Sequence, residues 1–163
     1  MRMTSNLQIF GHRAAMESQF WLGNPLEARE QGKRVLALDE PRRAGRWMQL
    51  TGQDLRSTVG SYSSHWTWML GYPDQAVRLS DETDARARRL GHAFNLAFTL
   101  VLGADTFDYR REPERLVERA READRLAREQ SIPIIYQVSV PRVTKGFNTH
   151  DLKAARQILE SPR

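Results

Sequence analysis

The sequence predicts an all-α fold: a single domain over residues 1–163, built as an α-solenoid of about four antiparallel helix hairpins. Three observations support this prediction. Apolar and small residues recur at three- and four-residue spacing along most of the chain, as they do on one face of a helix. Alternating runs of Val, Ile and Thr that would suit strands are scarce. The pattern Leu-Gly-x-Pro-x-x-Ala occurs twice, at 22–28 and 70–76.

The expected helices follow one another along the chain with short breaks between them. They cover 8–22, 26–38, 54–70, 74–90, 94–109, 113–130, 132–147 and a last segment that ends at 160. Pro141 is expected to kink or break the helix over 132–147. Thr149 or Asp151 is expected to cap the last helix. Paired in order, these helices give four hairpin units, at 8–38, 54–90, 94–130 and 132–160.

Prolines and capping residues mark where several of these helices begin and end. Pro25, Pro73 and Pro113 each precede a helical pattern, and a proline suits the first helical turn because its missing N–H has no partner there. Asp54 is expected to cap the helix that follows it, and Gly91 to end the helix before it.

The segment 39–53 is expected to be an irregular connection between the first two units. Its prolines and glycines, Pro41, Gly45 and Gly52, interrupt regular structure. Its apolar side chains, Trp47, Met48 and Leu50, indicate that it nevertheless packs against another part of the molecule.

Aligning the chain on the three prolines places mostly small residues at matching positions. Nine residues before each proline stand Met16, Ser64 and Ala104; three residues after stand Ala28, Ala76 and Leu116; seven after stand Gly32, Ser80 and Ala120. Small side chains at such positions let the two helices of a hairpin approach closely. The doubled pattern is therefore interpreted as the turn of a repeated hairpin, with Leu-Gly closing the first helix and Pro opening the second.

With this spacing the sequence resembles the tetratricopeptide repeat superfamily. The spacing from Gly23 to Ala28 and from Gly71 to Ala76 matches the turn and second helix of that repeat. The third unit departs from it, with Arg111 in place of the glycine. The resemblance implies a right-handed superhelical array whose first helices line the concave side.

A longer stretch resembles the C-terminal helical region of large bacterial signalling proteins. The residues that carry this resemblance are Gly52-Gln53-Asp54, the Trp-rich helix ending in the second repeat of the pattern, and Gly91-His92 with the Phe-rich helix after it. Such proteins carry an ATPase module ahead of the repeats, preceded by an adenylate cyclase or winged-helix domain. The resemblance implies a bacterial regulatory module, as a stand-alone fragment of a larger regulator.

Composition and motifs exclude several classes of chemistry. The chain has no Cys, which removes disulfides and thiol nucleophiles. None of the phosphate-binding glycine motifs or metal-binding His spacings is present, so no cofactor, metal or catalytic residue is expected. With no apolar run of membrane-spanning length and no signal-peptide pattern, the expected location is the cytoplasm.

The charge pattern predicts solvated helix faces. The net charge is +5, from 25 basic and 20 acidic residues. Acids and bases alternate along 111–130, which is typical of exposed faces with pairs four residues apart. Interleaved acids also argue against nucleic acid as a partner.

The aromatic residues of the helix over 54–70 are the most informative group for function. One interpretation is that they fill the contacts between neighbouring hairpins. The other is that His65 and Trp68 line the concave face and contact a partner. By the repeat alignment, Phe20 and Asp108 occupy the position of Trp68 in the other units.

The expected function is a non-catalytic module that binds a protein or peptide. The alternative is a regulatory domain that senses a small molecule in the concave groove. An apolar end of the array is further expected to favour a homo-oligomer, since repeat arrays need polar caps.

Overall fold

The structure is a computed structural model that describes residues 2–40 and 44–135. Regular structure in these residues is entirely α-helical, which confirms the all-α prediction. Seven helices are described: α1 (Arg2–Trp21), α2 (Pro25–Leu38), α3 (Ala44–Thr51), α4 (Leu55–Met69), α5 (Pro73–Leu90), α6 (Ala93–Arg110) and α7 (Pro113–Glu129). None of these helices combines the length and hydropathy that a bilayer span needs.

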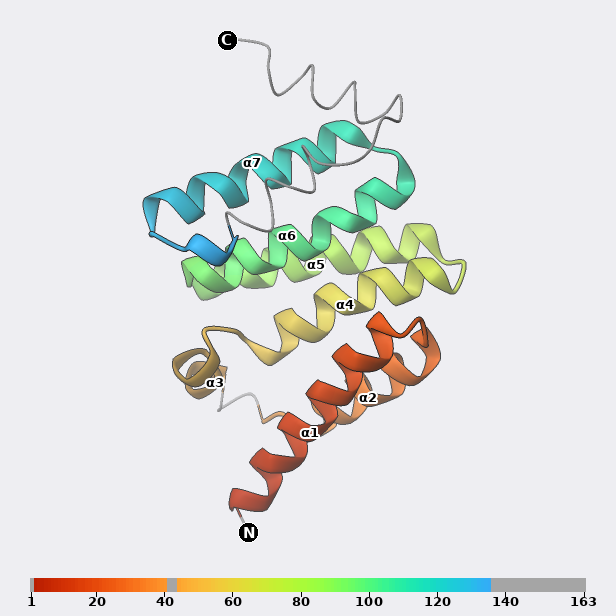
Figure 1. Cartoon of the computed structure of the whole chain (residues 1–163), viewed down its shortest axis with the longest axis vertical. Coiled ribbons are helices and arrows are strands. Elements are labelled where there is room, and N and C mark those ends of the chain that lie inside the picture. The colour runs from red at the N-terminus through yellow and green to blue at the C-terminus, as the bar shows by residue number, and fades with distance from the viewer. Residues whose placement is uncertain (1, 41–43, 136–163) are drawn as a thin grey trace.

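Consecutive helices form three closely packed pairs, α1 with α2, α4 with α5, and α6 with α7. The pairs follow one another along the long axis of the molecule, as Figure 1 shows. Contacts of α4 with α2 and with α6, and of α5 with α6, join each pair to the next. The first helices of the last two pairs, α4 and α6, are thus direct neighbours.

The local signals at the helix ends are confirmed. Pro25, Pro73 and Pro113 each stand in the first turn of a helix. The Asp54 carboxylate accepts the Ser57 backbone N–H at 2.9 Å and so caps α4. Gly91 has a left-handed backbone with φ of 66° and ends α5, a conformation that glycine adopts without strain.

The prediction of an irregular segment over 39–53 is wrong in its centre, where α3 forms a short helix. Trp47 explains this difference, because its indole is 2% exposed and its ring packs edge-on against Phe10 of α1 at a centroid distance of 5.1 Å. Burying so large a ring stabilises the turn of helix that carries it. Gly52, with φ of 71°, then ends α3.

Two further predictions concern the ends of the chain. α1 begins at Arg2, six residues before the expected start at residue 8. The fourth expected unit, 132–160, lies largely outside the described residues; residues 133–135 are helical.

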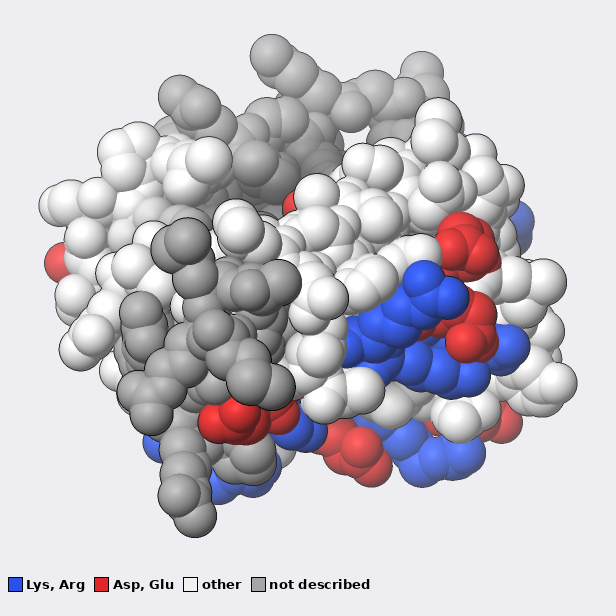
Figure 2. All heavy atoms as spheres, turned by 90° about the horizontal axis from the view of Figure 1, so that it is seen from below, with Lys and Arg blue, Asp and Glu red and all other residues white. Residues whose placement is uncertain are grey.

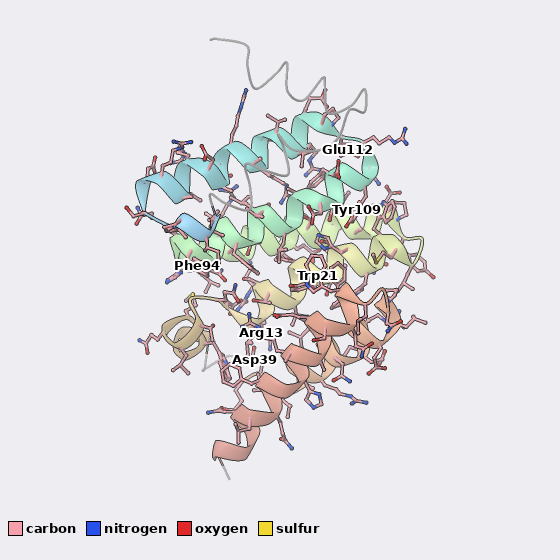
Figure 3. The ribbon with its side chains drawn as sticks, in the orientation of Figure 1. Arg13, Trp21, Asp39, Phe94, Tyr109 and Glu112 are labelled. Carbon is pink, nitrogen blue, oxygen red and sulfur yellow. The ribbon has the colours of Figure 1, made fainter. Side chains whose placement is uncertain are left out.

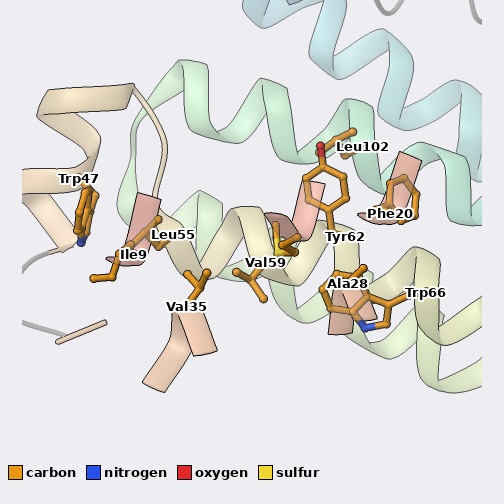
Figure 4. Close-up of a cluster of buried hydrophobic side chains, with 11 residues drawn as sticks. Ile9, Phe20, Ala28, Val35, Trp47, Leu55, Val59, Tyr62, Trp66 and Leu102 are labelled. Atoms are coloured by element: carbon orange, nitrogen blue, oxygen red, sulfur yellow. The ribbon is translucent and has the colours of Figure 1, made fainter. Parts of the chain in front are cut away.

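Two clusters of buried side chains form the apolar core. The larger one joins α1, α2, α3 and α4, with Leu102 contributed by α6, and Figure 4 shows its members, which include Ile9, Val35, Trp47, Val59 and Trp66. The smaller one lies between α6 and α7 and includes Leu100, Ala123 and Ala127. The contact between α4 and α6 is largely polar, as described below.

Most of the small residues expected inside the hairpins are buried. Ala28 and Ala76 are fully buried, whereas Leu116 is only partly buried. A Cβ atom at Gly32 would lie 2.9 Å from the ring of Trp66, so the absence of a side chain there lets α2 approach α4.

Candidate functional site

A connected set of aromatic rings crosses the first helices of the three pairs. Phe20 of α1 contacts Tyr62 and His65 of α4, with centroid distances of 5.1 and 5.4 Å. His65 in turn lies 5.9 Å from Tyr109 of α6, and Trp68 lies 4.7 Å from the same ring. At these distances and tilts, ring pairs attract one another beyond simple area burial. The rings therefore tie α1, α4 and α6 together.

The structure corrects the assignment of two predicted site residues to the binding face. His65 is fully buried and Phe20 is 5% exposed, so both belong to the core. The His65 imidazole Nε2–H donates to the Leu102 carbonyl of α6 at 2.6 Å, because a carbonyl can only accept. Packing of α6 over α4 covers the face that the repeat alignment assigned to the concave side.

The other two predicted residues reach the surface. Asp108 is exposed near the end of α6, and Trp68 is partly exposed near the end of α4. Trp68 stacks on Tyr109 at a tilt of 35°, so one face of its ring is supported. Such a half-buried ring holds its position and needs little ordering when a partner binds.

Sequence reasoning missed Trp21, the most exposed tryptophan of the described side chains. It lies at the last position of α1, is 62% exposed, and contacts Phe20 edge-on at 5.1 Å. Figure 3 shows Trp21 and Tyr109 on α1 and α6. Its place directly before the first Leu-Gly turn is the signal that could have identified it.

Further apolar side chains are exposed at the turns that end these helices. They are Leu22 and Leu26 at the α1–α2 turn, and Met69 and Tyr72 at the α4–α5 turn. Both turns lie at the same edge of the molecule in Figure 1. Together with Trp21 and Trp68, these side chains define what we call the aromatic edge.

The α4–α6 contact next to these rings is a polar seam of four hydrogen bonds. Besides the His65 bond, Thr106 donates to Ser64 at 3.0 Å, and Asn95 accepts the Asp54 backbone N–H at 2.9 Å. The Asn95 amide also donates to the Ser57 hydroxyl at 3.4 Å. The helices are close enough for these bonds because their facing side chains are mostly small and hydroxylic.

The carboxylate at the start of this seam, Asp54, is buried and fully paired. Arg86 of α5 donates to it twice, at 2.7 and 3.0 Å, and Ser57 donates through its N–H and its hydroxyl at 2.9 Å each. Burial alone would raise the pKa of Asp54, but the hydrogen bonds from Arg86 and Ser57 outweigh it and hold the pKa below its ordinary value. The same pairing raises the pKa of Arg86.

A second buried pair joins Asp84 of α5 to Arg119 of α7. Arg119 is 7% exposed, which contradicts the solvated face expected over 111–130. Its guanidinium stacks on the Phe107 ring, with its central carbon 4.5 Å from the ring centroid, and forms ion pairs with Asp84 and Asp81. Burial raises the pKa of Asp84 to about 6 despite the nearby Arg119 charge. Burial lowers the pKa of Arg119.

Surface charges of opposite sign lie next to one another. Figure 2 shows Asp and Glu side chains bordering the Lys and Arg side chains on the face seen from below. On α2, for example, Glu30 pairs with Lys33 at 2.8 Å. Within the described residues, no three His, Asp or Glu side chains form a group that could hold a metal ion.

Comparisons with known proteins gave no match, whether against protein-family models, curated proteins or solved structures.

Proposed function

We propose that the chain is a non-catalytic interaction module that binds a protein or peptide segment at the aromatic edge. The observation that supports this proposal is the exposure of Trp21, whose ring packs edge-on against the buried Phe20, together with the partly exposed Trp68, whose ring packs against Tyr109. Trp and Tyr are the side chains that most often dominate binding energy at interfaces. Exposed apolar side chains gathered in one place are typical of such surfaces.

The proposal includes the tetratricopeptide-like, right-handed superhelical arrangement that the sequence predicts. Three stacked helix pairs and the buried Ala28 and Ala76 support it. Stacked helix pairs build extended surfaces that bind partner segments. In this proposal the chain serves bacterial signalling or transcriptional regulation in the cytoplasm.

Capture from the native cell extract, followed by affinity measurements with the captured partner, tests this function. Trp21→Ala and Trp68→Ala are each expected to weaken binding by about tenfold or more, the loss typical of a hot-spot residue. Leu50→Ala is the matched control, since Leu50 is 60% exposed but lies on α3. Thermal melting of each variant separates binding from folding.

Two results would contradict the proposal. One is a partner that binds all three variants equally. The other is a Trp68 variant whose loss of affinity is fully explained by unfolding, which would assign Trp68 to the core.

Ligand sensing in the concave groove remains the second candidate function. Packing of α6 against α4 buries His65, one of the two residues expected to line that groove.

A further inference from the structure

The outward face of α1 differs in charge from the outward face of α7. Among residues 6–21 of α1, the exposed positions carry no charged group: they are Leu7, Gln8, Phe10, Gly11, Ala14, Ser18 and Trp21. On α7 every exposed residue is charged: they are Glu114, Glu118, Arg121, Arg125, Arg128 and Glu129. A charged outward face is typical of a helix that only water covers. The outward face of α1 lacks this property.

The large apolar side chains on this face of α1 are well exposed. Their exposed fractions are 65% at Leu7, 39% at Phe10 and 62% at Trp21. Spacings of three and four residues place them in one stripe along the helix. An apolar stripe of this kind is typical of a helix that packs against a second helix.

The charged side chains of α1 in the same residues interact within the molecule instead. Arg13 donates to Glu17 at 2.9 Å, one turn further along the helix. His12 Nδ1 lies 2.7 Å from the amide oxygen of Gln31 on α2. These groups lie beside the contacts of α1 with the rest of the chain, so they do not interrupt the apolar stripe.

We propose that the outward face of α1 is a contact between two copies of this chain, which pair through their α1 helices in antiparallel orientation about a two-fold axis. A two-fold contact brings a surface against itself, so any net charge on the surface repels its own copy. The chain as a whole has a net charge of +5, yet this face has none. The face is therefore suited to self-association, and the inference does not rest on the function proposed above, although Trp21 belongs to both surfaces.

The order of side chains along α1 suits this pairing. With the two-fold axis between Ala14 and Ala15, Gly11 lies opposite Ser18 of the other copy, and Leu7 lies opposite Leu22, which is 71% exposed. Two helices that cross are closest at the crossing point and diverge toward their ends, so small residues fit the centre and large ones the ends. Antiparallel orientation also places the positive end of each helix dipole beside the negative end of the other.

The dimer is expected to be weak. Residues 7–22 of a helix span about 23 Å, and a contact of this length between two single helices lies at the small end of specific interfaces. A dissociation constant of about 10–100 μM is therefore expected.

Sedimentation velocity of the full chain, without any partner, tests this proposal between about 1 and 500 μM, a range that brackets the expected dissociation constant. A monomer–dimer equilibrium is the expected result. Ala14→Arg brings two positive charges together at the axis and is expected to weaken the dimer by about tenfold or more. Ala37→Arg is the matched control, because Ala37 is an exposed alanine of α2, and it is expected to leave the equilibrium unchanged. Thermal melting confirms that both variants fold.

Single cysteines report the orientation, since the chain has no cysteine of its own. Ala14→Cys lies at the axis and is expected to form a disulfide-linked dimer under mild oxidation. Leu7→Cys is not, because the two copies of residue 7 would lie about 20 Å apart, far beyond the reach of a disulfide. A chain that stays monomeric over the whole concentration range would overturn the proposal, as would equal weakening by the two arginine variants. Crosslinking of Leu7→Cys as fast as that of Ala14→Cys would overturn the antiparallel pairing.

Discussion

Asp54 and Asp84 are both buried carboxylates that form an ion pair with an arginine, yet their pKa values move in opposite directions. Asp54 accepts four hydrogen bonds, two from Arg86 and two from Ser57. Asp84 has the Arg119 contact, but its second oxygen has no donor. Burial disfavours both charges, and the number of donors on each carboxylate decides which effect is larger. Asp54 therefore stabilises the fold as an anion, whereas an ionised Asp84 costs stability.

The largest expected effect of a substitution in this comparison is at Asp54. Asp54→Ala removes the cap of α4 and leaves Arg86 without its carboxylate, so the free energy of unfolding is expected to fall by about 3–4 kcal/mol. Urea unfolding monitored by circular dichroism measures this change. Asp74→Ala is the control, because its pair with Arg110 has a carboxylate that is 81% exposed. The free energy of unfolding of that variant is expected to fall by less than about 1 kcal/mol. Equal decreases in the two variants would contradict the comparison.

The next effect is the dependence of stability on pH. The Asp84 pKa is about 6 in the folded chain against an ordinary value of 3.8, so the folded state binds more protons between these pH values. The free energy of unfolding is therefore expected to fall as pH rises from about 4 to about 6.5, by about 2–3 kcal/mol from this group. Asp54 acts in the opposite sense in a lower window, because its stabilisation is lost only as pH falls below the ordinary pKa.

Asp84→Asn isolates this contribution. The difference in unfolding free energy between the wild type and this variant, measured across the pH range, gives the Asp84 term alone. If the difference stays constant from about pH 4 to about pH 7, the Asp84 carboxylate is fully paired like that of Asp54.

The smallest effect concerns Gly103, on which the Asp84–Arg119 pair packs. A Cβ atom there would lie 2.9 Å from both Arg119 Nη1 and Ser80 Oγ, so Gly103→Ala is expected to destabilise by about 1 kcal/mol despite the better helix propensity of alanine. At Gly11 of α1 an added Cβ would contact nothing within 4 Å. Gly11→Ala is therefore expected to stabilise by about 0.5–1 kcal/mol. Thermal melting of both variants measures these changes in stability. An increase in melting temperature for both variants would show that Arg119 can move away from the added Cβ atom at Gly103.

The sequence was informative where local chemistry decides the structure. Prolines at the first turn, Asp54 as a cap and Gly91 as a stop depend only on nearby backbone, and the structure has all of them. α3 was missed because the burial of Trp47 against Phe10, which the sequence does not show, outweighs the flanking breakers.

The candidate site was less predictable, for a similar reason. Trp68 was assigned from residue type and spacing, but only the position of α6 shows that His65 is covered. The burial of Arg119 was not predicted, because this residue lies in a run of alternating charges that is typical of solvated faces. The nearby small residues Ser80 and Gly103, together with Phe107, allow its guanidinium to lie between helices, and they are far from it in sequence.

The polar seam between α4 and α6 restricts how these helices can move. Dispersion contacts are not directional, so two helices with an apolar contact can slide past one another by a small distance with little loss of contact energy. Hydrogen bonds require defined distances and angles, and displacement of α6 along α4 by one helical turn, about 5.4 Å, would break all four bonds of the seam together. Sliding is therefore expected at the apolar contact of α2 with α4, while α4 and α6 move as a single rigid body.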